Sequence, residues 1–370
     1  MILLIPGPVT TRPETRAAAA HDYAPWDLDF RTLVATLAER LRDIAGGQPG
    51  KHVALPLPGC GHFAIEAAIR TLVPAGDRLL LPMTGDYASR IARLARESGR
   101  AVHELEVAPN QPADPTAIEA ALRNHPTIRY IATVYSETST GIVHPVPAIA
   151  AIAHSLGRRL IVDAVSAFGA LPLDLSAAPA IDLVAFTANK CLEGLPGAAF
   201  VVARTAALEA ARGQAASWSL DFAELHDHYQ RSPGSPRFTP PAGTLAALAT
   251  ALDFYQAEGG QPARLARYAA NRDALCDGIR ALGLAPILPR AVQGPIVVNV
   301  AAPDHPAWNL QRFVDLLKHR GFLISNFKNT LEPSFRVGCI GAIEPTDIRR
   351  ATEAMGEALA ELGIATRQAA

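Results

Sequence analysis

Short apolar runs alternate with amphipathic stretches from about residue 50 to residue 205, and this alternation constrains the fold more than any other feature of the sequence. Repeated strand and helix units of this kind build a mainly parallel sheet flanked by helices. We expect seven strands, which fall within residues 52–58, 77–83, 101–107, 128–136, 158–166, 182–188 and 197–203. The short turn "LPG" before the last run leaves no room for a crossover helix, so we expect that strand to run antiparallel to its predecessor.

The alternation stops near residue 240, which indicates a second structural unit. Two long helical patterns, at 243–260 and 261–283, lead to short strands at 295–300, 322–325 and 334–341 and to helices at 309–321 and from Asp347 onward. A chain of 370 residues also exceeds the size at which a single core usually stops growing. We therefore predict an α/β fold with a large domain over residues 14–261, and a smaller α+β C-terminal domain over residues 262–370 that takes in residues 1–13.

The charge balance and the cysteine usage limit the possible partners. The 34 basic and 35 acidic residues nearly cancel, which argues against a nucleic-acid or membrane-surface partner and favours a small molecule. The four cysteines contain no Cys-x-x-Cys pair, so we expect no metal site and a reducing cytoplasm. The initial apolar run ends at Pro6 without the features of a signal peptide, and no apolar stretch approaches the ~20 residues that span a bilayer.

A lysine and an aspartate follow two of the predicted strands at their carboxyl ends, where open α/β sheets bind ligands. Lys190 ends the run "DLVAFTANK", and Asp163 ends the run "RRLIVD". Such a lysine either extends its ammonium group to solvent or, when desolvated, forms a Schiff base. Such an aspartate either caps the next turn or pairs with a cation such as a protonated pyridine nitrogen. Together the two residues favour pyridoxal phosphate.

The turn "PGCGH" after the first strand has the features of a phosphate site. Gly59 and Gly61 allow a tight turn, and the following helix offers free N–H groups and the positive end of its dipole to an anion. Glycines are common at strand-to-helix turns, so this motif is informative only beside Lys190 and Asp163.

Seven segments distributed over nearly the whole chain carry a family resemblance: "PGPV", "GCGHFAIEAA", "SETSTG", "IVDAVSAFG", "TANKCLEGLPG", "RFTPPAGT" and "FRVGCIG". Together they resemble the class V, fold type I aminotransferases, which use pyridoxal phosphate. The segments "WDLDF", "DAVSAFGALPLDL" and "SFRVGCIGAIEPTDI" are most similar to those of family members that transfer the amino group of 2-aminoethylphosphonate to pyruvate. The resemblance implies phosphonoacetaldehyde and L-alanine as products.

The resemblance also implies roles for individual residues around the cofactor. Lys190 would form the Schiff base and act as the general base, and Asp163 would hold the pyridine nitrogen. The other residues implied to bind the cofactor are Gly59, Cys60, Gly61 and His62 at the phosphate, Tyr87 stacked on the ring, Thr138 at the phenolic oxygen, and Thr187 and Asn189 nearby. Thr239 and Thr244 are implied to reach the phosphate of the neighbouring subunit, which predicts a homodimer with shared sites.

The residues implied at the substrate end are led by Arg336, whose planar guanidinium suits a carboxylate or a phosphonate. Lys328, Trp26 and Asp27 would shape the same end of the pocket. Without the resemblance, Arg336 would be interpreted as a surface residue of a C-terminal strand. Cys339, three residues further along an apolar strand, is interpreted as a small buried hydrophobe rather than as a nucleophile.

Two departures from the pattern leave other reactions open. The chain has "SNFK" at 325–328 where phosphonate aminotransferases usually show Tyr-Pro-Gly-Lys, and its "GCGH" is closer to the alanine:glyoxylate branch. One alternative is an ammonia-lyase that acts on 1-hydroxy-2-aminoethylphosphonate, and another is an aminotransferase between amino acids and glyoxylate or pyruvate. A non-catalytic binding protein on the same fold is a further alternative, against which the intact Lys190 and Asp163 argue.

Overall fold

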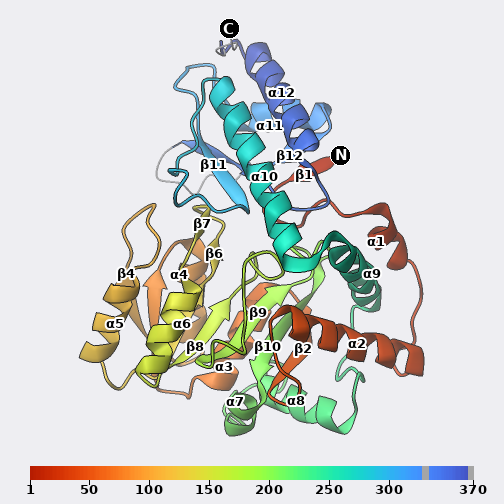
Figure 1. Ribbon diagram of the computed structural model, residues 1–370, viewed down its shortest axis with the longest axis vertical. Helices are drawn as coiled ribbons and strands as arrows, with labels where there is room; N and C mark the ends of the chain where they lie inside the picture. Colours follow the sequence, from red (N-terminus) through yellow and green to blue (C-terminus); the bar gives the residue numbers. More distant parts are fainter. Residues whose placement is uncertain (327–332, 366–370) are drawn as a thin grey trace.

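The computed structural model describes residues 1–326 and 333–365, and its centre is a seven-stranded sheet (Figure 1). In spatial order the strands are β2 (His52–Gly59), β10 (Gly197–Arg204), β9 (Ile181–Thr187), β8 (Arg159–Asp163), β5 (Tyr130–Val134), β3 (Arg78–Met83) and β4 (Ala101–Glu106). Only β10 runs against the others, since it pairs antiparallel with both β2 and β9. The predicted seven strands and the predicted antiparallel strand are therefore confirmed.

Helices cover both faces of this sheet, which explains why its central strands are mostly apolar and almost entirely buried. Every residue of β9 is buried. On one face the core includes side chains of α3 (Gly61–Leu72), α4 (Asp86–Glu97), α7 (Thr205–Ala210) and α8 (Phe222–Arg231). On the other face it includes side chains of α2 (Leu28–Ile44), α5 (Pro115–Asn124), α6 (Val146–Ser155) and α9 (Ala242–Glu258).

A separate apolar core lies in the upper part of Figure 1, around the C-terminal segments. Its elements are β11 (Val297–Ala301), β12 (Phe322–Ile324), β13 (Ser334–Gly338), α11 (Leu310–His319), α12 (Pro345–Glu361) and the far end of α10 (Gly260–Ala281). The first strand, β1 (Ile2–Leu4), pairs in parallel with β12, so the N-terminal residues pack with this second core. This pairing supports the predicted grouping of residues 1–13 with the C-terminal unit, whose boundaries remain a prediction.

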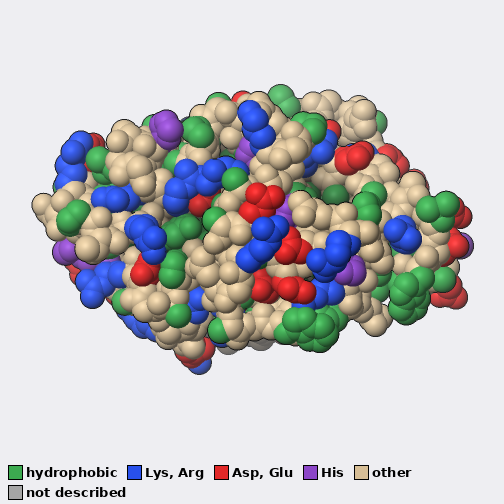
Figure 2. All heavy atoms as spheres, turned by 90° about the horizontal axis from the view of Figure 1, so that it is seen from below, with side chains coloured by type: hydrophobic (Ala, Val, Ile, Leu, Met, Phe, Trp, Pro, Cys, Tyr) green, Lys and Arg blue, Asp and Glu red, His purple; other side chains and the backbone are tan. Residues whose placement is uncertain are grey.

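A short helix and a short hairpin complete the fold. The short helix α1 (Pro13–Ala18) packs against α9, and β6 (Ser136–Glu137) forms a hairpin with β7 (Ile142–Val143). On the face shown in Figure 2, basic and acidic side chains are interspersed. Among the described residues, no helix combines the length and the apolar character needed to cross a bilayer.

Candidate active site

Lys190 lies in the turn that follows β9, with its amine buried beside the N-terminal segment. Its Nζ donates a hydrogen bond to the carbonyl oxygen of Pro6 at 2.6 Å. Gly7 lies directly against the same side chain, because a Cβ atom there would be 2.4 Å from Lys190 Cδ. Burial lowers the pKa of Lys190 to about 8, although the nearby Asp163 carboxylate opposes the shift. The amine is thus neutral much more often than an exposed lysine at the same pH.

Asp163 is the last residue of β8, the strand beside β9. Its side chain is buried, and its Oδ1 accepts a hydrogen bond from the N–H of Val165 at 2.9 Å. Burial raises the pKa of Asp163 to about 6, while the hydrogen bond from Val165 lowers it. Because β8 and β9 are parallel neighbours, Asp163 and the Lys190 turn emerge at the same edge of the sheet.

Both residues line one cavity of about 180 Å³, which we call the lysine–aspartate cavity. The turn after β2 and the first turn of α4 close its other sides. The predicted site residues that line it, besides Lys190 and Asp163, are Cys60, Gly61, His62, Tyr87, Thr187 and Asn189. The structure therefore brings eight residues from four separate segments of the chain to a single cavity.

A second cavity, of about 460 Å³, adjoins the first and contains Arg336; we call it the arginine cavity. The two cavities share Lys190, Tyr87 and Arg90. Arg336 is buried in β13, where its Nη1 donates to the carbonyl oxygen of Thr138 at 2.8 Å and its Nη2 donates to Ser325 Oγ at 3.3 Å. These bonds fix the guanidinium, so an acidic group of a ligand in this cavity would meet a cation held in one orientation.

Glu137 is a site residue that the sequence did not reveal. It is fully buried, and its carboxylate accepts hydrogen bonds from Ser139 Oγ at 2.6 Å, from the N–H of Ser139 at 3.1 Å and from the N–H of Tyr87 at 3.3 Å. Burial raises the pKa of Glu137, and these three donors oppose the rise. The carboxylate thus ties the β6–β7 hairpin to the N-terminus of α4, where Tyr87 faces both cavities. The signal in the sequence that could have identified Glu137 was its position in the segment "SETSTG".

Some predicted site residues do not line these cavities within this chain. Trp26 is 79 % exposed, and Asp27 caps α2 by accepting a hydrogen bond from the N–H of Asp29. Thr244 Oγ1 donates to the carbonyl oxygen of Pro196, and Thr239 is exposed. The remaining cases are Gly59, which ends β2 beside the cavity, Thr138, which bonds Arg336 through its carbonyl oxygen but lines neither cavity, and Lys328, which lies outside the described residues.

The comparisons with known proteins match this geometry. The family model "Aminotransferase class-V" matches residues 36–336. The chain belongs to the class V aminotransferases. It is 47 % identical over 367 residues to a 2-aminoethylphosphonate–pyruvate transaminase of Burkholderia ambifaria, with 99 % of this chain and 98 % of that protein covered. It is 43 % identical over 363 residues to a protein of the same name from Pseudomonas aeruginosa, with coverages of 98 % and 97 %.

Solved structures of related class V aminotransferases share the fold. The pyridoxamine–pyruvate aminotransferase of Mesorhizobium loti superposes with a TM-score of 0.90 at 26 % identity, covering 100 % of this chain and 94 % of that one. The alanine–glyoxylate aminotransferase of Nostoc superposes with a TM-score of 0.88 at 25 % identity, with coverages of 97 % and 95 %. The expected fold type I architecture and the family assignment are confirmed.

Pyridoxal phosphate is the cofactor of this class V aminotransferase, and the cavity residues fit it. Thr187 lines the lysine–aspartate cavity, and its Oγ1 is buried without a hydrogen-bond partner within the described part of the chain, as is typical of a site that binds a polar ligand. A Cβ atom at Gly61 would lie 2.4 Å from Val165 Cγ2, so a larger residue would crowd the turn that begins α3. The residues that would hold the group are Gly61 and His62 at the helix N-terminus, Asp163 at the ring nitrogen and Lys190 at the aldehyde.

Proposed function

We propose that this class V aminotransferase transfers the amino group of 2-aminoethylphosphonate to pyruvate, giving phosphonoacetaldehyde and L-alanine. The observation that carries the proposal is the adjoining pair of cavities, which places a partly neutral amine, Lys190, between an aspartate and a buried arginine. The names of the relatives at 43–47 % identity over nearly their full length support the same donor and acceptor.

The side chains of this chain divide the work of the reaction. Pyridoxal phosphate, when bound, supplies an aldehyde for the substrate amine and a ring that withdraws electrons from the carbon bearing nitrogen. Lys190 would act as the general base that removes the proton from that carbon, which requires a neutral amine. Asp163 would hold the ring nitrogen in its protonated form. Arg336 binds the phosphonate of the donor and the carboxylate of the acceptor by charge-assisted hydrogen bonds.

The protein is proposed to act as a cytoplasmic homodimer. Several large apolar side chains are exposed in the single chain, among them Trp26 at 79 % and Trp218 at 70 %, as expected for surfaces that a second subunit covers. Thr239 and Thr244 contribute to neither cavity of their own chain, which agrees with a role in the site of the partner. The four cysteines are free thiols, as is usual in a reducing compartment.

The direct test is turnover by the purified, cofactor-loaded protein. We expect 2-aminoethylphosphonate to be consumed only when pyruvate is present, with one alanine formed per phosphonoacetaldehyde. Lys190→Ala should abolish this turnover and the visible absorption band, whereas the exposed Lys51→Ala should leave both unchanged. Ammonia release from 1-hydroxy-2-aminoethylphosphonate without pyruvate would instead identify a lyase. A preference for amino acid donors with glyoxylate would identify an amino acid:glyoxylate aminotransferase.

A further inference from the structure

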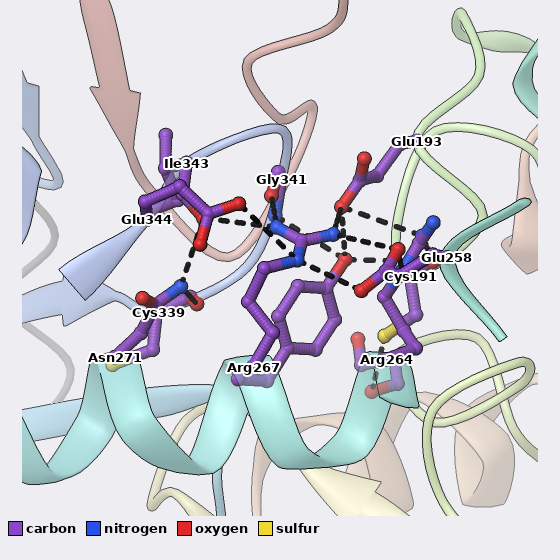
Figure 3. A network of polar contacts seen from close by, with 12 residues as sticks. Cys191, Glu193, Glu258, Arg264, Arg267, Asn271, Cys339, Gly341, Ile343 and Glu344 are labelled. Atoms are coloured by element: carbon purple, nitrogen blue, oxygen red, sulfur yellow. Dashed lines mark hydrogen bonds and ion pairs between the residues drawn. The ribbon is translucent and has the colours of Figure 1, made fainter. Parts of the chain in front are cut away.

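A network of buried polar side chains joins α10 to Cys191 and Glu193, in the turn that follows Lys190 (Figure 3). Its central groups are the guanidinium groups of Arg264 and Arg267, the hydroxyl of Tyr268 and the carboxylate of Glu193. Arg264, Tyr268 and Glu193 are at most 4 % exposed. The burial of charged groups costs free energy unless each group has a partner. Each side chain of this network therefore needs its partners in defined positions.

One end of the network holds the turn that carries Lys190. The N–H of Glu193 donates to the carbonyl oxygen of Lys190 at 2.9 Å, and the Glu193 carboxylate accepts from Tyr268 Oη and from Arg267 Nη2, each at 2.7 Å. Arg264 Nη1 donates to the carbonyl oxygen of Cys191 at 2.5 Å. Glu193 has a left-handed φ of 57°, a conformation that non-glycine residues adopt only where their surroundings impose it. The helix α10 therefore determines the shape of this turn.

The other end of the network holds the segment that follows Arg336. Arg267 Nη1 donates to the carbonyl oxygens of Gly341 at 2.7 Å and Ile343 at 2.9 Å. The N–H of Gly341 donates to Tyr268 Oη at 3.3 Å, and Asn271 Nδ2 donates to the carbonyl oxygen of Cys339 at 3.0 Å. As Figure 3 shows, Arg267 lies between Glu193 on one side and Gly341 and Ile343 on the other. Arg267 and Tyr268 of α10 thus contact both segments, while Arg264 and Asn271 each contact one of them.

We propose that Glu193, together with Tyr268 and Arg267, is a positioning element that fixes Lys190 relative to Arg336. This inference rests on the proposed function, since it concerns the two ends of the same substrate. The amine must reach the carbon bearing nitrogen while the acid group stays on Arg336, and a displacement of about 1 Å can cost roughly 100-fold in rate. A rigid helix that binds both segments sets that distance without contacting the substrate.

The test compares two substitutions within the element with a matched control. Glu193→Gln removes the charge that faces Lys190's turn, and Tyr268→Phe removes one hydroxyl that bonds both Glu193 and Gly341. The control is Asp182→Asn, because Asp182 is likewise a buried carboxylate paired with two arginines, Arg159 and Arg204, but lies near the start of β9, at the end opposite to the Lys190 turn and outside the network. All three variants are expected to lose some thermal stability.

The positioning role predicts a selective effect on chemistry. In Glu193→Gln and Tyr268→Phe, kcat should fall by roughly 10- to 100-fold with little change in KM, and the affinity for ethylphosphonate, which needs only Arg336, should persist. The pH midpoint of the visible absorption band, which reports the surroundings of the Lys190 nitrogen, should shift in these two variants and not in Asp182→Asn.

Equal kcat values and equal midpoints in all three variants would show that the network only stabilises the fold, and would overturn the proposal. Should Glu193→Gln not fold, Tyr268→Phe still decides, because it removes one oxygen atom and keeps the ring. The absorbance comparison needs no turnover, so it remains decisive even if 2-aminoethylphosphonate proves not to be the donor.

Discussion

Burial determines the pKa values of the two charged residues at the site, Lys190 and Asp163. Lys190 is an ordinary lysine whose amine is surrounded by Gly7, Pro6 and Asp163 instead of water, and this lowers its pKa to about 8. Burial shifts the pKa of Asp163 in the opposite direction and raises it to about 6. The order of the two values means that a neutral amine and an ionised carboxylate coexist most readily above pH 8.

This order predicts a pH dependence of cofactor loading. The rate at which cofactor-free protein regains its visible band should fall roughly tenfold per pH unit below pH 8, because only the neutral amine attacks an aldehyde. Below about pH 6, Asp163 of the cofactor-free protein also becomes protonated and loses the charge that would attract the ring nitrogen, so loading should fall more steeply still. Stopped-flow absorbance across this pH range would measure both effects, and a rate that is constant from pH 6 to pH 8 would contradict the burial of Lys190.

Two elements, the β6–β7 hairpin and α4, together bring Tyr87 to the cavities. The hairpin supplies the Glu137 carboxylate, which accepts hydrogen bonds from the N–H of Tyr87 on α4 and from the N–H and hydroxyl of Ser139. Gly85, just before the helix, has a φ of 152°, and a Cβ atom there would lie 2.7 Å from Glu137 Cγ. The hairpin and the helix therefore approach one another more closely than another residue at position 85 would permit.

Glu137→Gln is expected to loosen this junction. The amide keeps one acceptor oxygen but turns an NH₂ group toward donors, so buried N–H groups lose their partner, at a cost of about 1–3 kcal/mol in the free energy of unfolding. Urea unfolding would measure the loss, and a weaker affinity for the cofactor should accompany it. The matched control is Glu66→Gln, whose half-buried pair with Arg70 one turn along the same helix contributes at most about 1 kcal/mol. Equal stability of the two variants would contradict the role of Glu137.

At the scale of the whole molecule, the site is expected to need two chains. A mixed dimer of a Lys190→Ala chain and a Thr239→Val/Thr244→Val chain contains one site with an intact lysine and intact partner threonines. If the threonines serve the neighbouring site, mixing two inactive proteins should restore activity, to about half that of a wild-type dimer. Purification of the mixed dimer by two different affinity tags and an assay of turnover would measure it. No recovery would place both threonines in the site of their own chain.

The sequence predicted the local elements better than their long-range contacts. The seven strands and the residues Lys190 and Asp163 followed from apolar patterns and strand ends, which are local signals. The spatial strand order and the pairing of β1 with β12 were not predicted, because partners far apart in the chain leave no periodic signal. Glu137 was missed for the same reason: its role depends on Tyr87, which lies on α4.

The pairing of Ile2–Leu4 with Phe322–Ile324 has a consequence for biosynthesis. Strand β1 lies far upstream of its partner β12 in the chain, so it has no strand to pair with until β12 has been synthesised. Until then the apolar run "ILLI" stays uncovered, and the Pro6 carbonyl that receives the Lys190 amine has no fixed place. The catalytic centre is therefore completed only after β12 has been made, and the nascent chain depends on protection from aggregation until then.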